Sequence, residues 1–340
     1  MKIVLDGFGG DYSPLETVMG AVLAVSENED VEVIITGKEK EIREILKDTS
    51  LEVQKRITVV NAEEVVENED EPISAVRTKK DSSLVKGLNL VAQKEGDAFV
   101  SAGNTGAVFT GATLIIKRIQ GIKRSALAPI IPTLKGKSVV VDSGANAECK
   151  PEYYPQFGLM GSVYSKCVLG NENPKVGLIN IGVEHHKGTH TVAEAYQLMQ
   201  KDENINFVGN VEAREVLKGV ADVYVCDGWS GNLVIKSTEG TLDVVFSLLK
   251  DIFKKNFLTK LAAVIILPHL KEMKKKFSAK ETGGALIIGL KAPVIKAHGN
   301  SDRTAIKNAI LFADKCAKGN ICIKTEELVK TQLSEAVALE

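Results

Sequence analysis

The chain has 340 residues, of which 44% are hydrophobic and 26% are charged, and its formal net charge at pH 7 is -1. These values are ordinary for a soluble globular protein with a sizeable core, and the length allows one large α/β domain or two smaller ones. The balanced charge provides no general attraction to nucleic acid, so we expect no nucleic-acid partner.

Cysteine usage and the first residues favour a protein of the reducing cytoplasm. The five cysteines are odd in number and form no CxxC pair, so neither a disulfide framework nor a zinc site is indicated. Residues 2–5 are typical of a strand rather than a signal peptide. No apolar run reaches the ~20 residues that span a bilayer. We therefore expect a cytoplasmic protein.

The N-terminal part alternates between strands and helices. Hydrophobic patterning predicts strands over residues 3–5, 31–35 and 57–60, and helices over 15–25 and 38–47. The first junction reads Asp6-Gly7-Phe8-Gly9-Gly10-Asp11, with Ser13 as a plausible helix N-cap. Because this is not GxGxxG, the dinucleotide-binding fingerprint is not met.

A polar, basic segment follows an acidic stretch at 61–71. Arg77, Lys79 and Ser82 precede a predicted amphipathic helix and could hold an anion. The other interpretation is a solvated basic helix start, and on spacing alone that interpretation is favoured.

The stretch 97–107 is the organising element of the chain. A short apolar strand over 98–100 runs into Gly103, Asn104, Thr105 and Gly106, and an apolar helix is predicted from 107 to 116. The first N–H groups of such a helix have no internal partners and lie at the positive end of its dipole. This junction suits phosphate or a developing oxyanion. A turn that only packs tightly remains the alternative.

Similar junctions recur along the chain. Predicted strands over 138–141, 175–181, 206–208 and 222–226 each run into turns rich in glycine, aspartate and asparagine. Short strands spaced by helices predict a parallel, doubly wound sheet, in which ligands bind at the carboxyl ends of the strands. We therefore expect these turns to gather on one edge of the sheet.

The character of the chain changes at residues 237–277, which we expect to form a helical insertion within a single domain over 1–340. Residues 257–258 and 261–267 are strongly apolar, but the run 261–267 is too short to span a bilayer. The lysines around them are Lys254, Lys255, Lys260, Lys271, Lys274, Lys275 and Lys276. Glycine-rich turns at 282–285 and 297–302, a helix over 305–313 and a polar helix or tail from 326 complete the chain.

Few single residues indicate a specific chemistry. His185 and His186 are adjacent and would diverge on a strand, and Lys187-Gly188 before His190 favours a loop, so we expect no metal site. Lys187 could bind phosphate or stabilise an oxyanion, or be an ordinary surface lysine. His298 could donate a proton, or cap a turn.

Several motifs together resemble the phosphate acyltransferases of bacterial phospholipid synthesis, the PlsX family. They keep order and spacing from residue 1 to about 313. The matching segments are 101–107 (Ser-Ala-Gly-Asn-Thr-Gly-Ala), 142–146 (Asp-Ser-Gly-Ala-Asn), 149–153 (Cys-Lys-Pro-Glu-Tyr), 156–157, 160–161, 180–182, 187–188, 208–212, 227–228, 231–232, 298–299 and 301–302. Four segments depart from the usual family form. They are 6–11 (Asp-Gly-Phe-Gly-Gly-Asp), 146–149 (Asn-Ala-Glu-Cys), the stretch after Gly182, which carries His185-His186, and the segment after Gly284, which lacks the usual proline.

The resemblance implies a Rossmann-like α/β/α fold with a mostly parallel sheet, akin to phosphotransacetylases and isocitrate dehydrogenase-like enzymes, in a homodimer. It implies acyl transfer from acyl-(acyl carrier protein) to inorganic phosphate without a cofactor. It also favours reversible attachment of 257–277 to the inner face of the cell membrane, with dimer or core packing as the alternative. A phosphotransacetylase using acyl-CoA and a nucleotide-binding regulatory module are the alternative functions.

The turns and the resemblance together select the candidate site residues. The catalytic candidates are Lys187, Asn104 and His298. The candidates for substrate or phosphate binding are Asp6, Gly9, Gly10, Asp11, Arg77, Lys79, Ser82, Gly103, Thr105, Gly106, Asp142, Ser143, Gly144, Asn146, Asn210, Asp227 and Asn232.

Overall fold

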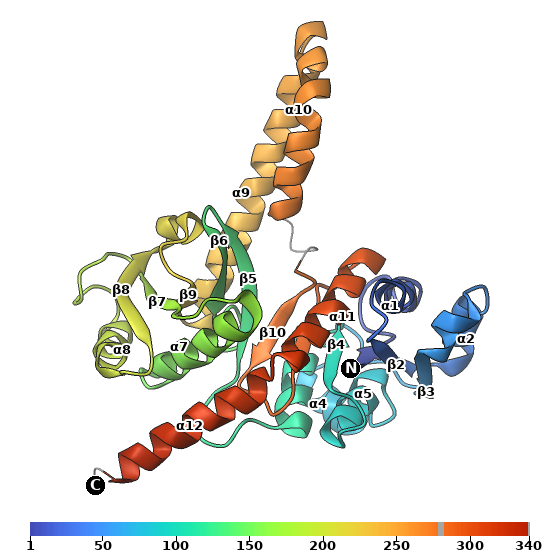
Figure 1. Ribbon diagram of the computed structural model, residues 1–340, viewed down its shortest axis with the longest axis horizontal. Helices are drawn as coiled ribbons and strands as arrows, with labels where there is room; N and C mark the ends of the chain where they lie inside the picture. The colour runs from blue at the N-terminus through green and yellow to red at the C-terminus, as the bar shows by residue number, and fades with distance from the viewer. Residues whose placement is uncertain (278–281, 339–340) are drawn as a thin grey trace.

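The computed structural model describes residues 1–277 and 282–338 and contains a sheet with helices on both faces (Figure 1). Within these residues the sheet has eleven strands in the order β3-β2-β1-β4-β11-β10-β5-β6-β9-β7-β8. The strands are β1 (Lys2–Asp6), β2 (Glu32–Gly37), β3 (Ile57–Asn61), β4 (Ala98–Ser101), β5 (Ala126–Thr133), β6 (Gly136–Val141), β7 (Lys175–Asn180), β8 (Asn206–Glu212), β9 (Val223–Val225), β10 (Ala285–Ile288) and β11 (Val294–Lys296). The predicted α/β class is confirmed.

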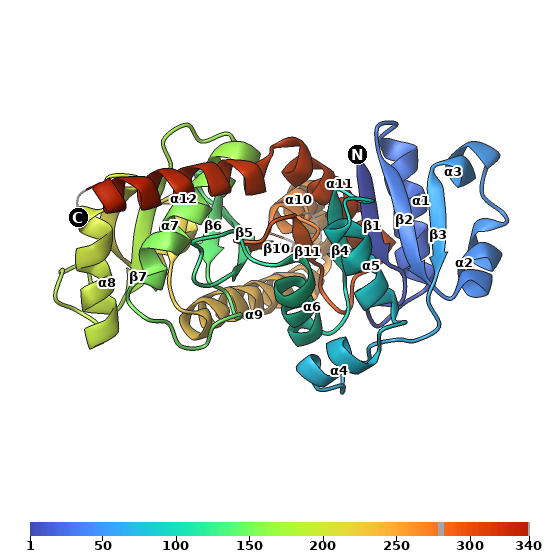
Figure 2. The same cartoon turned by 90° about the horizontal axis from the view of Figure 1, so that it is seen from below.

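The helices cover both faces of this sheet (Figure 2). They are α1 (Leu15–Glu27), α2 (Glu39–Leu46), α3 (Leu51–Lys55), α4 (Pro72–Thr78), α5 (Ser83–Ala92), α6 (Thr105–Gly111), α7 (Tyr153–Tyr164), α8 (His190–Lys201), α9 (Gly228–Lys254), α10 (Phe257–Lys276), α11 (Arg303–Lys318) and α12 (Ile321–Ala338). Two π-helical turns, Ala112–Ile116 and Ser165–Leu169, extend α6 and α7, and a 3-10 helix covers Ala213–Lys218.

The two ends of the sheet run in opposite directions. Strands β3, β2, β1, β4 and β11 are parallel, and so are β6, β9, β7 and β8. Between these groups, β10 is antiparallel to both β11 and β5, and β5 is antiparallel to β6. These pairings reverse the strand direction. The expectation that all the glycine-rich turns gather on one edge of the sheet is therefore wrong.

The hydrophobic core is continuous on one face of the sheet and divided on the other. Helices α1, α7 and α11 pack on the first face, where a single cluster of buried side chains reaches from β2 to β7. On the opposite face, α5 and α6 form one cluster with β1, β4 and β11, and a separate cluster surrounds β6, β8 and β9. We call this opposite face the cleft face.

Side-chain alternation decides which polar residues reach the cleft face. Successive side chains of a strand point to opposite sides, so every second residue shares a face. Val4, Phe99 and Val294 belong to the cleft-face cluster. The residues two positions later are Asp6, Ser101 and Lys296. They therefore face the cleft at the ends of three neighbouring strands, and Lys296 is the direct sheet partner of Ser101.

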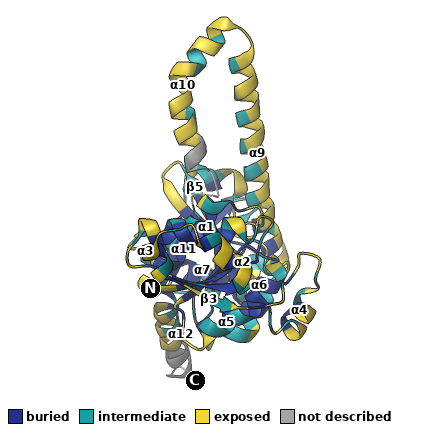
Figure 3. Cartoon of the chain, turned by 90° about the vertical axis from the view of Figure 1, so that its right-hand side faces the viewer, coloured by how far each residue is buried: buried dark blue, intermediate teal, exposed yellow. Residues whose placement is uncertain are grey.

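Helices α9 and α10 form an antiparallel hairpin that projects from the sheet, and its surface is almost entirely exposed (Figure 3). The sequence places the start of this segment at residue 237. Helix α9 begins earlier, at Gly228, where the side chain of Asp227 caps it. Among the described residues, no helix combines the length and the apolar character needed to cross a membrane.

Three strands were not predicted from the sequence. Strand β5 contains Pro129 and Pro132, and prolines count against a strand in a single sequence. Strands β10 and β11 are very short and lie among glycine-rich turns. Ser13 also differs from expectation, because its hydroxyl donates to the carbonyls of Phe8 and Gly10 instead of capping α1.

Candidate active site

The first wall of the site is built around Asp6 at the end of β1. The Ser101 hydroxyl donates a hydrogen bond of 2.7 Å to Asp6 Oδ2 and accepts one of 3.0 Å from the Gly103 N–H. The Phe8 N–H donates to Asp6 Oδ1 at 3.3 Å. Burial raises the pKa of Asp6, and hydrogen bonds from Ser83 and Ser101 oppose that increase. Asp6 thus fixes the turn that leads into α6.

Three turns pack backbone against backbone beside Asp6. The Asp11 N–H donates to the Gly299 carbonyl at 2.8 Å. A Cβ atom on Gly9 would lie 2.5 Å from Asp6 Oδ2 and 2.8 Å from the Gly103 nitrogen. Gly10 has a φ of +108°, a left-handed conformation that glycine adopts without strain. The turns after β1, β4 and β11 therefore form one tightly fitted unit.

Asn104 holds a loop over this unit. Its Oδ1 accepts a hydrogen bond from the Ala107 N–H and so caps α6. Its Nδ2 donates to the carbonyls of Asn68 at 2.9 Å and Asp70 at 3.3 Å. The amide is thus committed to the fold. In the structure Asn104 anchors the segment 67–70, and the expectation that it also stabilises charge directly stays a prediction.

The residues expected to form a basic anion site serve the same segment. Lys79 pairs with Asp70 and donates to the Val65 carbonyl at 2.9 Å. Ser82 is buried, caps α5 and donates to the Lys79 carbonyl at 2.7 Å. These contacts engage both side chains within the fold, and their assignment as phosphate ligands stays a prediction. Arg77 lies exposed on α4, and we find no hydrogen bond of its side chain among the described residues.

The second wall is the turn after β6, organised by Asp142. This carboxylate accepts hydrogen bonds from the N–H groups of Leu127 at 2.8 Å, Ser143 at 2.7 Å and Asn146 at 2.6 Å. Burial raises the pKa of Asp142, and the hydrogen bonds, with those from Leu127 and Asn146 foremost, oppose that increase. Asp142 therefore shapes the turn around Gly144 and is itself fully occupied.

The start of α9 packs directly on this second wall. Asp227 caps the helix by accepting a hydrogen bond of 2.7 Å from the Ser230 N–H. A Cβ atom on Gly231 would lie 1.9 Å from the Asp142 carbonyl oxygen, so only glycine fits there. Asn232 is the nearest neighbour of Gly144, at 3.8 Å from the position of an added Cβ. The turn of Asp142 and the start of α9, with Asp227 and Asn232, therefore lie side by side, and the binding roles predicted for these residues stay predictions.

A cavity of about 480 Å³ separates the two walls on the cleft face. Leu127 and Ile287 are sheet partners at its base, and Ile287 is also paired with Val294, just before Lys296. This register brings the turn after β6 to the end of β11, although their strands run in opposite directions. The lining residues are Glu71, Pro72, Ile73, Thr105, Gly106, Phe109, Thr110, Leu127, Gly144, Ala145, Ile287 and Lys296.

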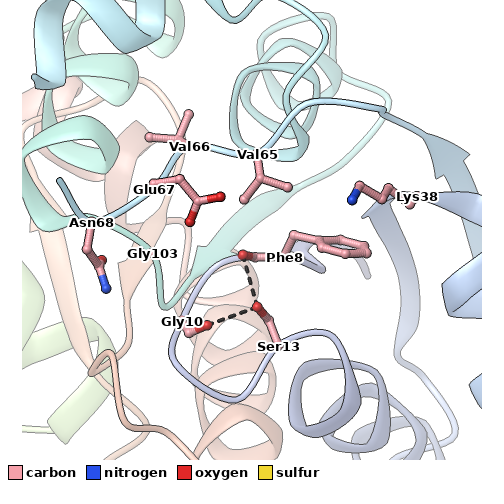
Figure 4. Close-up of a pocket in the computed structure, with 9 residues that line it drawn as sticks. All are labelled: Phe8, Gly10, Ser13, Lys38, Val65, Val66, Glu67, Asn68 and Gly103. Carbon is pink, nitrogen blue, oxygen red and sulfur yellow. Dashed lines mark hydrogen bonds between the residues drawn. The ribbon is translucent and has the colours of Figure 1, made fainter. Parts of the chain in front are cut away.

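A smaller cavity of about 230 Å³ lies on the other side of the glycine-rich turns (Figure 4). It is lined by Phe8, Gly10, Ser13, Lys38, Val65, Val66, Glu67, Asn68 and Gly103. The Lys38 ammonium lies 5.6 Å from the centre of the Phe8 ring. The segment 65–73 therefore contributes walls to both cavities, and Asn104 anchors it between them.

Lys187 and Asn210 lie apart from both cavities. Lys187 is half-buried on the loop after β7, and Asn180 Nδ2 donates to its carbonyl at 2.9 Å. Asn210 Nδ2 donates to the Glu184 carbonyl at 2.8 Å and so holds the same loop. His185 and His186 are on this loop, not on a strand. No group of three or more metal-binding side chains is found within the described ranges.

His298 is exposed on the turn after β11. Its Nε2 lies 4.0 Å from Glu239 Oε1 on α9. Desolvation, followed by the nearby Lys236 ammonium, lowers the pKa of His298. This lowered pKa disfavours the imidazolium that a general acid at neutral pH would need.

The sequence analysis missed the lysine that lines the larger cavity. Lys296 is only 8% exposed, and its ammonium donates to the carbonyls of Ala102, at 3.4 Å, and Ala297. Burial lowers the pKa of Lys296 to about 8, while Asp6 and Asp11 act in the opposite direction. The sequence did contain one signal, because Lys296 directly follows the apolar residues Val294 and Ile295 in a short buried strand. Lysine is almost never fully buried unless it is paired.

Comparisons with known proteins show which family and which folded structures this chain is similar to. The family model described as "Fatty acid synthesis protein" matches residues 1–324. A phosphate acyltransferase from Alkaliphilus oremlandii is 52% identical over 310 residues, covering 91% of this chain and 92% of that protein. A phosphate acyltransferase from Clostridium tetani is 47% identical over 334 residues, covering 98% and 99%. The solved structure of the EutD phosphotransacetylase from Staphylococcus aureus has a TM-score of 0.60 at 17% identity and covers 94% of both chains, which supports the fold.

Proposed function

The chain belongs to the phosphate acyltransferase family, and from this premise we propose that it transfers a fatty acyl group from acyl-(acyl carrier protein) to inorganic phosphate, releasing acyl phosphate for phospholipid synthesis. The observation that carries the proposal is the composition of the 480 Å³ cavity, which combines an apolar wall with a buried positive charge. A fatty acyl thioester and a phosphate anion require these two surfaces side by side.

The apolar wall would accept the acyl chain. Phe109, Leu127 and Ile287 line it together with Pro72 and Ile73. Each methylene group that moves from water into such a surface contributes ~0.8 kcal/mol, so a long chain gains far more from it than an acetyl group. This supports a fatty acyl donor over a short one.

The polar end of the same cavity would bind phosphate and the developing oxyanion. The backbone at Gly106 and Gly144 approaches it from the two walls, and the Lys296 ammonium lies at the end of β11. Phosphate is already a nucleophile, so the site needs to orient it, stabilise the oxyanion and protonate the departing thiol. We also propose that Lys187, which does not line this cavity, supplies a second positive charge from the loop after β7 when substrate is bound.

The direct test is to incubate the protein with radiolabelled phosphate and a palmitoyl-(acyl carrier protein), and to measure labelled acyl phosphate. Parallel reactions use palmitoyl-CoA and acetyl-CoA. The proposal requires the carrier-protein thioester to be used most efficiently. A preference for acetyl-CoA would instead indicate a phosphotransacetylase. Absence of acyl phosphate with every donor would contradict acyl transfer to phosphate altogether.

We further propose that the α9–α10 hairpin attaches the enzyme reversibly to the inner face of the cell membrane. Phe257 and Leu258, at the start of α10 beside the hairpin turn, are 79% and 74% exposed, and Ile265, midway along α10, is 72% exposed. The side chains of Lys254 and Lys260 beside them are also exposed, whereas those of residues 274–276 lie outside the described side chains. Apolar side chains with a lysine collar suit anionic headgroups.

Two charge substitutions test the membrane proposal. The Leu261→Glu and Ile265→Glu variant should lose sedimentation with phosphatidylglycerol vesicles and keep full activity in solution. Leu51→Glu is the matched control, because Leu51 is 76% exposed on α3, far from the hairpin. If the hairpin variant instead still binds vesicles but no longer uses the acyl carrier protein thioester, the hairpin binds the acidic carrier protein rather than the membrane. Loss of the folded or dimeric state would show that these residues are buried in an assembly.

We also propose a homodimer. Trp229 and Leu233 are 66% and 51% exposed on the first turns of α9, and Ile181 is 79% exposed at the end of β7. Large exposed apolar groups of this kind are typical of protein contacts. Sedimentation equilibrium of the wild type and of Trp229→Glu should give a dimer and a monomer, respectively. A monomeric wild type would contradict the proposal.

A further inference from the structure

Lys296 combines burial with incomplete pairing. An ammonium group has three N–H donors and is costly to bury without partners. Two carbonyls, those of Ala102 and Ala297, accept hydrogen bonds from it, and no ion pair of Lys296 occurs among the described residues. Its side chain lines the larger cavity. One donor therefore remains for a ligand in that cavity.

Charged and titratable groups near Lys296 lie on several segments, including Glu71, which lines the same cavity and caps α4 with its carboxylate. Asp6 lies at the end of β1 and Asp11 follows in the next turn, and both favour the charged ammonium. His298 follows Lys296 by two residues in the chain, and the two side chains interact electrostatically. Burial outweighs the carboxylates and holds the pKa of Lys296 at about 8. A model thiol has a pKa of about 8.5, so the lysine and a departing thiol are closely matched for proton exchange.

We propose that Lys296 is a catalytic residue that protonates the departing thiolate and then removes the remaining proton of the attacking phosphate. This inference rests on the proposed function and adds a chemical role to it. The geometry supports it because Lys296 lies in the cavity that has both the apolar wall and the two glycine turns. It is also the one lysine among that cavity's described lining residues.

The step balances without any further reactant. An oxygen of hydrogen phosphate attacks the thioester carbonyl carbon and forms the C–O bond. The C–S bond then breaks, and its electron pair leaves with sulfur. The Lys296 ammonium gives a proton to that sulfur, and the resulting amine accepts the proton of the phosphate. The products are acyl phosphate and a free thiol, and Lys296 ends protonated as it began.

Other polar groups near the cavity are less suited to this role. Burial raises the pKa of the Cys149 thiol to about 12, with Asp142 and Asp227 adding to the increase. Asp142 accepts N–H donors on both of its oxygens. His298 is exposed and its lowered pKa favours the neutral ring.

Chemical rescue by small amines provides the test. Lys296→Ala should lower kcat by about 10²–10⁴, the usual contribution of a proton-transferring side chain. Ethylamine should then restore acyl phosphate formation by at least about tenfold, whereas tetramethylammonium, which has the charge but no N–H, should not. Lys291→Ala is the matched control, because Lys291 is an exposed lysine between β10 and β11. It should keep its activity and respond to neither additive.

Each outcome decides the inference. Activity of Lys296→Ala within about threefold of the wild type, or equal rescue by tetramethylammonium, would overturn it. If Lys296→Ala does not fold, Lys296→Arg replaces it, since arginine keeps the charge but holds its proton. That variant should keep the KM for phosphate and lose kcat, and a retained kcat would overturn the inference. Failure of the wild type to form acyl phosphate would instead overturn the proposed function, and this inference with it.

Discussion

The Ser101 hydroxyl donates a 2.7 Å hydrogen bond to Oδ2 of the buried Asp6. The bond joins the carboxyl ends of the neighbouring strands β4 and β1. Because the same hydroxyl accepts the Gly103 N–H at 3.0 Å, the shape of the glycine-rich turn depends on the position of Asp6. The shape of this turn thus depends on a residue 95 positions earlier in the chain.

Removing this hydroxyl should weaken the fold and the site together. Ser101→Ala leaves Asp6 Oδ2 short of one donor and the Gly103 N–H without its acceptor, a loss of about 1–3 kcal/mol for buried groups. The KM for phosphate should rise as well. Urea unfolding and steady-state kinetics measure the two effects. Ser26→Ala is the control, because that hydroxyl bonds to the Val22 carbonyl near the surface. Equal losses in both variants would disprove the role of Ser101.

Asn104→Asp should keep the cap of α6 and remove the hydrogen bonds that anchor the segment 67–70. Aspartate can still accept the Ala107 N–H and caps a helix as well as asparagine. In the wild type the Asn104 amide nitrogen lies 2.9 Å from the Asn68 carbonyl oxygen. The variant places a carboxylate oxygen there, which cannot donate and repels the carbonyl. We expect faster amide hydrogen exchange in 67–71 and a higher KM, with little change in Tm. Asn89→Asp, which loses a donor to Val85 on α5, is the control. Unchanged exchange in 67–71 would argue against the anchor.

A single methyl group at Gly106 should disturb the larger cavity. The added Cβ would lie 2.6 Å from Pro72 Cγ, so the proline wall must move. Overpacking of this kind costs about 1–3 kcal/mol, and we expect kcat/KM to fall by at least about fivefold in Gly106→Ala. Gly240→Ala on α9 is the matched control, because nothing lies within 4 Å of its added Cβ. Similar kinetics for the two variants would refute this account of the wall.

Lys187 is the proposed second positive charge. If its ammonium contacts the transition state, Lys187→Ala should lower kcat at saturating phosphate by about 10²–10³, the usual loss for one preorganised donor. Lys201→Ala, an exposed lysine at the end of α8, should behave as the wild type. A loss below about threefold, which is under ~1 kcal/mol, would identify Lys187 as a surface residue.

The pH dependence of kcat should show the ionisation of Lys296. Its ammonium form donates the proton, and the pKa near 8 means that this form prevails below about pH 8 and is lost as the pH rises further. We therefore expect kcat to fall on the alkaline side of about pH 8. Stopped assays across the pH range measure this limb. The Lys291→Ala variant should show the same alkaline fall in kcat. If Lys296→Arg also shows this fall, the ionisation belongs to another group.

The sequence alone identified the elements whose signals are local. Strands β1, β2, β3, β6 and β7 follow from short apolar runs, and the glycine turns after them follow from residue type. Strand β5 was not predicted, because Pro129 and Pro132 count against a strand when the sequence is considered alone. Strand β5 nevertheless pairs with β10 on one side and with β6 on the other, and no local pattern reveals these pairings.

The roles of the site residues depended on contacts between distant segments. The turn at 101–107 was visible from its composition, but the engagement of the Asn104 amide by Asn68 and Asp70 was not. Lys296 is a single lysine after a three-residue strand, and only its burial against Ala102, 194 positions earlier, distinguishes it from a surface lysine.

The sequence by itself therefore determined the α/β class, the family and most of the turns, because hydrophobic period, turn chemistry and motif spacing are all short-range properties. The tertiary structure alone decided which turns meet. The antiparallel strands β10 and β5 reverse the sheet, and their register brings the turn of Asp142 to the end of β11 on one face. Strand pairing of this kind depends on packing across the whole sheet, so no single stretch of the chain specifies it.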